Sequence, residues 1–171
     1  MNVISISVLA AGTVGLLLCA STAGVAATQS ITTRITFDTP LSLVKNADIN
    51  FGTVRARTAS TYTITTAGVI TATGSGQWLY GTKNPANITI AGSATQTVNI
   101  SVGGYTANRG VTPSAATCAY NGGASGSCTI VGAAAPGTGK TLLVGVSAAA
   151  NATRAAGSTS TPSFTITVVY P

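Results

Sequence analysis

The sequence contains no histidine and no glutamate, and its only acidic residues are Asp38 and Asp48. Hydrolytic enzymes commonly use a histidine as general base or a pair of carboxylates as acid and base, and here both aspartates would have to serve one reaction. Of the three cysteines, only Cys118 and Cys128 lie after residue 27, and two sulfurs without histidine cannot complete a tetrahedral metal site. These absences argue against an enzyme, and we expect no cofactor and no metal.

Charged residues of either sign are scarce, at 6% of the chain, and eight Lys and Arg give a net charge of +6. The basic residues are scattered, and only Arg55 and Arg57 lie close together. Nucleic-acid interfaces cluster such residues, often with aromatic side chains between them. We therefore expect no nucleic-acid partner. An isolated positive charge favours solubility or weak attraction to an acidic cell envelope.

Helical periodicity is also missing, whereas 45% of the residues are hydrophobic. After residue 27 the apolar residues alternate with Thr, Ser, Asn and Gly, which is typical of antiparallel sheets with one solvated face. We expect a single all-β domain, an antiparallel β-sandwich of about eight short strands. The strands are predicted at residues 41–44, 48–54, 61–66, 69–73, 87–91, 97–102, 128–131, 141–146 and 163–170, with loops at 74–81, 103–124 and 148–161.

Residues 1–27 have the pattern of a secretory leader. They carry no charged side chain, contain an apolar run from residue 3 to 18, and end in the small residues Ala26 and Ala27. This pattern predicts a signal peptide removed after Ala27. An uncleaved membrane anchor is the alternative, because the stretch is long enough to span a bilayer. Ser5, Ser7 and Ser21 dilute the run and favour cleavage, after which no membrane span is left.

Residues 28–40 then form an N-terminal arm, which Pro40 separates from a sandwich domain at 41–171. In the segment 31–37, Ile31, Thr33, Ile35 and Phe37 alternate with polar residues such as Arg34. The period of two and the β-branched residues predict a strand with one apolar face. A strand on an arm can complete the sheet of its own domain or that of a neighbour.

Cys118 and Cys128 are ten positions apart and flank a glycine-rich stretch. In an exported protein this spacing predicts a disulfide that closes a short loop or hairpin.

Trp78 and Tyr80 lie between glycines in the predicted loop 74–81. Aromatic faces stack on the apolar faces of sugar rings, so these residues are candidates for ligand contact. The alternative is that Trp78 covers one end of the core.

Three passages resemble a known family: residues 48–54 (Asp-Ile-Asn-Phe-Gly-Thr-Val), 142–145 (Leu-Leu-Val-Gly) and 164–170 (Phe-Thr-Ile-Thr-Val-Val-Tyr). Their order is similar to exported bacterial β-sandwich domains of unassigned function, which are similar in turn to pilin-like subunits that polymerise by donor-strand exchange. The resemblance implies an immunoglobulin-like sandwich whose arm fills a groove in the next subunit. Pilins usually tie their first strands together with the disulfide, and the late cysteine pair here departs from that pattern.

Two functional hypotheses follow. In the first, the protein is the repeating subunit of an extracellular bacterial filament, a homopolymer in which Ile31, Thr33, Ile35 and Phe37, helped by Leu41 and Leu43, enter the neighbouring copy. A periplasmic chaperone and an outer-membrane assembly pore would be further partners. In the second, the arm stays with its own domain, and the protein is a monomeric cell-surface or periplasmic binding or adhesion module with Trp78 and Tyr80 on a carbohydrate.

The leader provides the first testable prediction. N-terminal sequencing of the exported protein is expected to give Thr28 as the first residue, because the small residues at 25–27 fit the peptidase site. An intact Met1 on exported protein would contradict cleavage.

Overall fold

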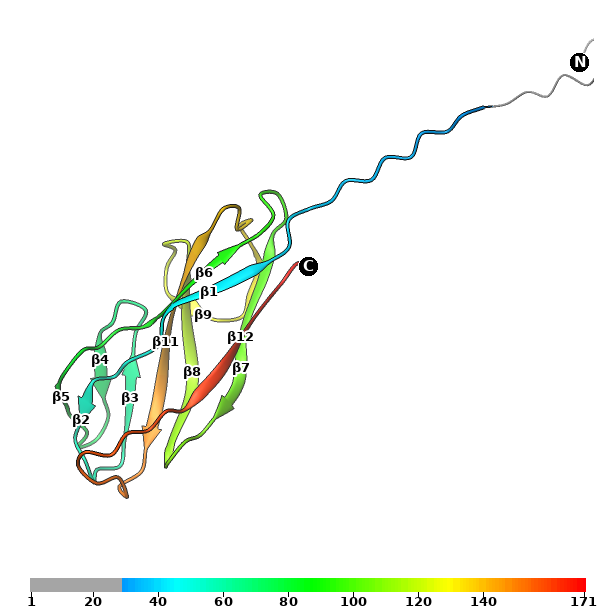
Figure 1. Ribbon diagram of the computed structural model, residues 1–171. Coiled ribbons are helices and arrows are strands. Elements are labelled where there is room, and N and C mark those ends of the chain that lie inside the picture. The colour runs from blue at the N-terminus through cyan, green and yellow to red at the C-terminus, as the bar shows by residue number, and fades with distance from the viewer. Residues whose placement is uncertain (1–28) are drawn as a thin grey trace, which may run out of the picture. The chain divides into compact units, whose positions relative to one another are not determined.

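The computed structural model describes residues 29–171, and the predicted leader at 1–27 lies outside this part (Figure 1). The described residues form an all-β protein, as predicted, with antiparallel sheets packed as a sandwich. Across residues 29–171, no helix has the length and apolarity needed to cross a bilayer. The strands are β1 (Ser42–Ala47), β2 (Thr53–Val54), β3 (Ser60–Ile64), β4 (Ile70–Ala72), β5 (Trp78–Tyr80), β6 (Ala86–Ala91), β7 (Val98–Thr106), β8 (Val111–Tyr120), β9 (Gly126–Ser127), β10 (Ile130–Ala133), β11 (Lys140–Ala150) and β12 (Ser163–Val169).

The larger sheet is built around β11, the longest strand. Along one side of β11 its first half pairs with β6 and its second half with β3, while β8 pairs along the other side. Strand β1 extends this sheet beyond β6, and β4 extends it beyond β3. All of these pairings are antiparallel, so β11 is the central strand to which the other segments of the sheet are attached.

The second sheet has the order β10–β7–β12, and a separate two-stranded ribbon joins β2 to β5. The core contains fully buried side chains from both sheets, including Ile90, Leu142 and Val144 from the larger sheet and Val98 and Ile100 from β7. Strand β6 has the predicted alternation, because Ile88 and Ile90 are buried while the residues between them are half-buried. A period of two in the sequence thus becomes one apolar face on the strand.

The predicted disulfide is present. Cys118 lies on β8, Cys128 lies just after β9, and both are buried in the core. Closing a ten-residue separation stabilises the fold by about 2.5–3 kcal/mol in the chain-entropy model.

Four details of the strand prediction are wrong. The predicted irregular stretch 103–124 contains the end of β7 and all of β8, whose small residues Ser, Ala and Thr give little alternation but pair along β11. The predicted aromatic loop contains β5, which pairs with β2. The predicted loop 148–161 begins inside β11, and the number of strands exceeds the expected eight.

Leu142 tests the core. Its side chain, near the start of β11, is 0% exposed, so Leu142→Ala is expected to lower the free energy of unfolding by about 2–5 kcal/mol. Leu79→Ala is the matched control, since Leu79 is 47% exposed, and it should cost about 1 kcal/mol or less. Urea denaturation of the two variants measures this difference, and equal losses would contradict the assignment of the core.

Candidate functional site

Strand β12 lies at the edge of the smaller sheet and, within residues 29–171, pairs only with β7 (Figure 1). Its other edge therefore presents unpaired backbone groups. Its side chains alternate between exposed and half-buried, and the half-buried row packs against the core. Ile100 on the adjacent β7 is 1% exposed, so the apolar row on β12 is less completely covered than its neighbour. The members of this row are Phe164, Ile166, Val168 and Tyr170.

Residues 31–37, predicted as a strand, form none in the single chain, because no second strand is hydrogen-bonded to them. Three of their apolar side chains are largely exposed: Ile31 at 89%, Ile35 at 70% and Phe37 at 88%. Thr33 is exposed as well. The segment thus offers apolar groups and unpaired backbone to solvent, and its pairing with another molecule stays a prediction.

Leu41 and Leu43, predicted as assembly residues, lie at the start of the domain's own sheet. Leu41 is half-buried and packs against the core. Leu43 lies on β1 opposite Ile90 of β6, and its side chain is 43% exposed. Both residues are therefore part of the domain rather than of the arm.

A hydrogen-bonded cluster, here called the clasp, joins the start of β1 to the end of β12. It consists of Asp38, Thr39, Ser93 and Tyr170. The Tyr170 hydroxyl donates to the carbonyl oxygen of Thr39 at 2.8 Å and accepts from the backbone N–H of Ser93 at 2.7 Å. Ser93 is 0% exposed, and its hydroxyl donates to a carboxylate oxygen of Asp38 at 2.6 Å. The clasp fixes the two residues that precede Pro40.

The carboxylate of Asp38 is held in its charged form. The hydrogen bond from the Ser93 hydroxyl lowers the pKa of Asp38, and a second bond from the Thr39 N–H, at 2.7 Å, lowers it further. A smaller loss of hydration opposes these effects by raising the pKa, but the net shift is downward. The clasp is therefore complete at neutral pH.

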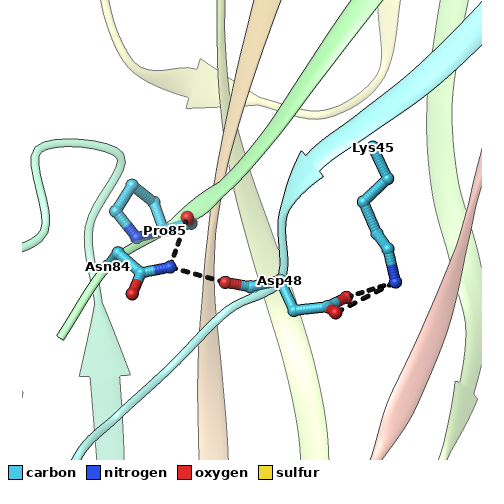
Figure 2. Close-up of polar contacts among 4 residues, drawn as sticks. All are labelled: Lys45, Asp48, Asn84 and Pro85. Carbon is cyan, nitrogen blue, oxygen red and sulfur yellow. Dashed lines mark hydrogen bonds and ion pairs between the residues drawn. The ribbon is translucent and has the colours of Figure 1, made fainter. Parts of the chain in front are cut away.

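The other aspartate belongs to a separate structural contact (Figure 2). Asp48 forms an exposed ion pair with Lys45 at 2.8 Å, and its carbonyl oxygen accepts a hydrogen bond from the Asn84 side chain at 2.6 Å. Backbone hydrogen bonds in both directions between Asn50 and Asn84 reinforce this link. The two aspartates serve different parts of the fold.

Trp78 and Tyr80, the predicted ligand contacts, both lie on β5, where Trp78 is 36% and Tyr80 66% exposed. The Lys83 ammonium lies 4.8 Å from the centre of the Trp78 ring. This cation–π contact occupies one face of the indole. Gly52 packs beneath both residues, with a positive φ of 65° and no room for a side chain: a Cβ there would lie 2.8 Å from the Tyr80 carbonyl oxygen.

Two shallow hollows lie near these features. One, of about 370 Å³, is beside the clasp and is lined by Thr39, Pro40, Ala94 and Thr138 among others. The second, of about 500 Å³, is next to the disulfide and includes Tyr120 and Ile130. Burial raises the pKa of Tyr120, whose hydroxyl donates to the Ala134 carbonyl. Among residues 29–171, no group of three or more potential metal ligands is found.

The fold and these contacts define a β-sandwich domain in which the outer edge of β12 is open within residues 29–171. Residues 41–170 match the family model described as a domain of unknown function, DUF4402, and the chain belongs to this family. The match covers β1 to β12 and both members of the disulfide. No curated protein and no solved structure matches the chain.

The clasp gives a prediction about stability. Tyr170→Phe removes both hydrogen bonds of the hydroxyl and leaves the N–H of fully buried Ser93 without its partner, so the free energy of unfolding should fall by about 1–3 kcal/mol. Tyr80→Phe, at an exposed hydroxyl, is the matched control and should change it by about 0.5 kcal/mol or less.

The same cluster predicts a pH dependence. Because the folded-state pKa of Asp38 is lowered, its contribution is present above the ordinary carboxyl pKa and is lost as the pH falls through the lowered value. Asp38→Ala should therefore flatten the loss of stability below about pH 4, measured against the parent chain by urea denaturation across pH. An unchanged acid slope in Asp38→Ala would contradict this role of the carboxylate.

Proposed function

We propose that the protein is the structural subunit of an extracellular bacterial filament. Residues 31–37 of one copy pair with the free edge of β12 in the next copy, and the contact repeats head to tail. The observation that supports this best is the coexistence, in one chain, of an unpaired strand edge with a half-buried apolar row and an unpaired segment with exposed apolar side chains. If the segment 31–37 adds to the edge of β12 as a further strand, the backbone groups of both become hydrogen-bonded and the apolar side chains of both become buried.

The two segments match in length and pattern. Strand β12 spans seven residues, and the alternating segment 31–37 has the same number of positions. At about 3.3 Å per residue, either would extend over roughly 20 Å. When the polar residues of the arm, such as Arg34, face solvent, Ile31, Ile35 and Phe37 face the core beside the β12 row. The arm then becomes the fourth strand of this sheet, in the order β10–β7–β12–arm.

Stable association of two copies requires contributions from both buried side chains and backbone hydrogen bonds. Burying three large apolar side chains stabilises the complex by about 5–9 kcal/mol, and association costs an estimated 4–15 kcal/mol, so the three anchors alone are marginal. The half-buried row on β12 also loses its remaining exposure when the arm covers it. Continuous backbone pairing along the edge adds to this, because each hydrogen bond contributes about 0.5–1.5 kcal/mol.

The contact produces a filament because it joins two different surfaces. Arm and edge lie on the same chain, so each copy offers one of each, and a head-to-tail contact that does not close on itself propagates. An open apolar edge before assembly is a site of aggregation. We therefore propose a periplasmic chaperone and an outer-membrane assembly pore as partners during export, and a location on the outside of the cell for the finished polymer.

The alternative function is a monomeric binding or adhesion module. Its support is the exposed aromatic pair Trp78 and Tyr80 on β5. A sugar ring on Trp78 would be limited to the indole face that Lys83 leaves free. This hypothesis needs no polymer, so the measurement of fibre formation described next distinguishes it from the filament hypothesis.

One residue of the arm tests the filament. Ile35→Asp places a charge among the buried side chains, so the contact should weaken by at least about a hundredfold, and the protein should elute as a monomer in size-exclusion chromatography and form no fibres in negative-stain microscopy. Thr36→Asp adds the same charge on the solvent face of the arm and should leave the fibres intact.

Because Ile35 is exposed in the single chain, the Ile35→Asp chain keeps its folded domain and an unoccupied β12 edge. A labelled peptide of residues 29–37 is expected to bind it. Fibres from Ile35→Asp equal to those of the parent chain, or a parent chain that is monomeric at all concentrations, would refute the filament.

A further inference from the structure

The clasp leaves almost no free chain between the arm and the domain. Phe37 is the last residue of the inserting segment, and Thr39 is already held by the Tyr170 hydroxyl. Asp38, the one residue between them, is itself bonded to Ser93. Two residue steps span at most about 7 Å. The donor domain must therefore lie directly against the copy that holds its arm.

We infer that the surface around the clasp is a second subunit interface, in contact with the next copy of this chain. This inference rests on the proposed filament and adds a rigid contact between domains to the inserted strand. The contact surface, here called the clasp face, consists of the exposed residues Pro40, Ala94 and Thr138 beside the 370 Å³ hollow. None of the three carries a charge.

The clasp also determines which end of β12 in the accepting copy lies next to the base of the incoming arm. In the accepting copy, the Tyr170 end of β12 is next to that copy's own Asp38 and Thr39. The base of the incoming arm therefore lies at the opposite end, beside Ser163. The inserted strand then runs antiparallel to β12, and each copy offers its clasp face at one end and receives a clasp face at the other.

The receiving end is already ordered. Ser163 pairs with Thr106 at the end of β7, and a tight turn follows at residues 107–110. Asn108 in this turn accepts hydrogen bonds from the Ser160 hydroxyl, at 2.6 Å, and from the Thr161 N–H, at 3.1 Å. Arg109, in the same turn, is exposed. Such a fixed surface can form a close contact without a large cost in conformational entropy.

Arginine on the clasp face tests this contact. Ala94→Arg and Thr138→Arg place a bulky positive charge against the end of the neighbour that carries Arg109. Each should raise the protein concentration needed for half-maximal fibre formation by roughly tenfold or more, because the bulky side chain holds the two domains apart and its charge repels Arg109. Thr71→Arg, on an exposed position of β4, is the matched control and should assemble like the parent chain.

Peptide binding separates this inference from the filament itself. In full-length chains that also carry Ile35→Asp, the labelled peptide of residues 29–37 should bind the Ala94→Arg and Thr138→Arg variants as tightly as the parent. Fibre formation by both arginine variants at the parent concentration, with the peptide still bound, would overturn the second interface alone. Failure of the peptide to bind any of these chains would overturn the strand insertion, and the second interface with it.

Discussion

The backbone of β11 is hydrogen-bonded on both sides along most of its length, and the rest of the sandwich depends on this pairing. Strands β6 and β3 share one side, and β8 takes the other. From this central strand, Leu142 and Val144 pack against residues of the other sheet such as Val98 and Ile100, and their side chains are 0% exposed. Strand β12 has the opposite situation, since within the described residues 29–171 it pairs on one side only. The N–H and C=O groups of a strand point to both of its sides and need hydrogen-bond partners on each. Strand β11 has such partners on both sides, whereas the outer N–H and C=O groups of β12 have none from another strand of this part of the chain.

The clasp connects these two situations. It ties the beginning of β1, on the larger sheet, to the end of β12, on the smaller one, through the buried Ser93. The same bonds fix Asp38 and Thr39, which carry the arm. Contacts that stabilise the domain thus also limit the freedom of the proposed donor segment, and a donor with little freedom loses less entropy when it binds. For the proposed filament, this coupling predicts a stiff polymer rather than a chain of loosely linked domains.

Sequence reasoning recovered the parts of the fold in which large side chains alternate. The strands at 61–66, 87–91 and 163–170 carry Ile, Val, Tyr or Phe at every second position, and each corresponds to an observed strand. Strand β8 was not predicted, because Ser114, Ala115 and Ala116 show no alternation of apolar and polar side chains. Its strand conformation depends instead on hydrogen bonding to β11, which is distant in the sequence.

The site was less predictable than the fold. The arm could be recognised from its own pattern, but the open edge of β12 depends on which strands pair elsewhere. The clasp joins Tyr170 to Ser93 and Thr39 across 77 and 131 residues. A pattern within a few neighbouring residues cannot predict contacts between residues so far apart in the sequence.

The remaining edges of the two sheets explain why β12 stands out. Free edges invite pairing with other chains, and proteins blunt them with lysine, proline, bulges or short length. Strand β1 carries Lys45 and a shift of register next to it. Strand β10 has a register shift around Gly132, whose φ is 65°, and β4 is only three residues long. Strand β12 contains no charged residue, no proline and no glycine, and its one irregularity is at its first residues, between Ser163 and Thr165. An edge left unprotected over Thr165–Val169, where β7 continues the regular ladder on the other side, fits a strand that another chain is meant to join.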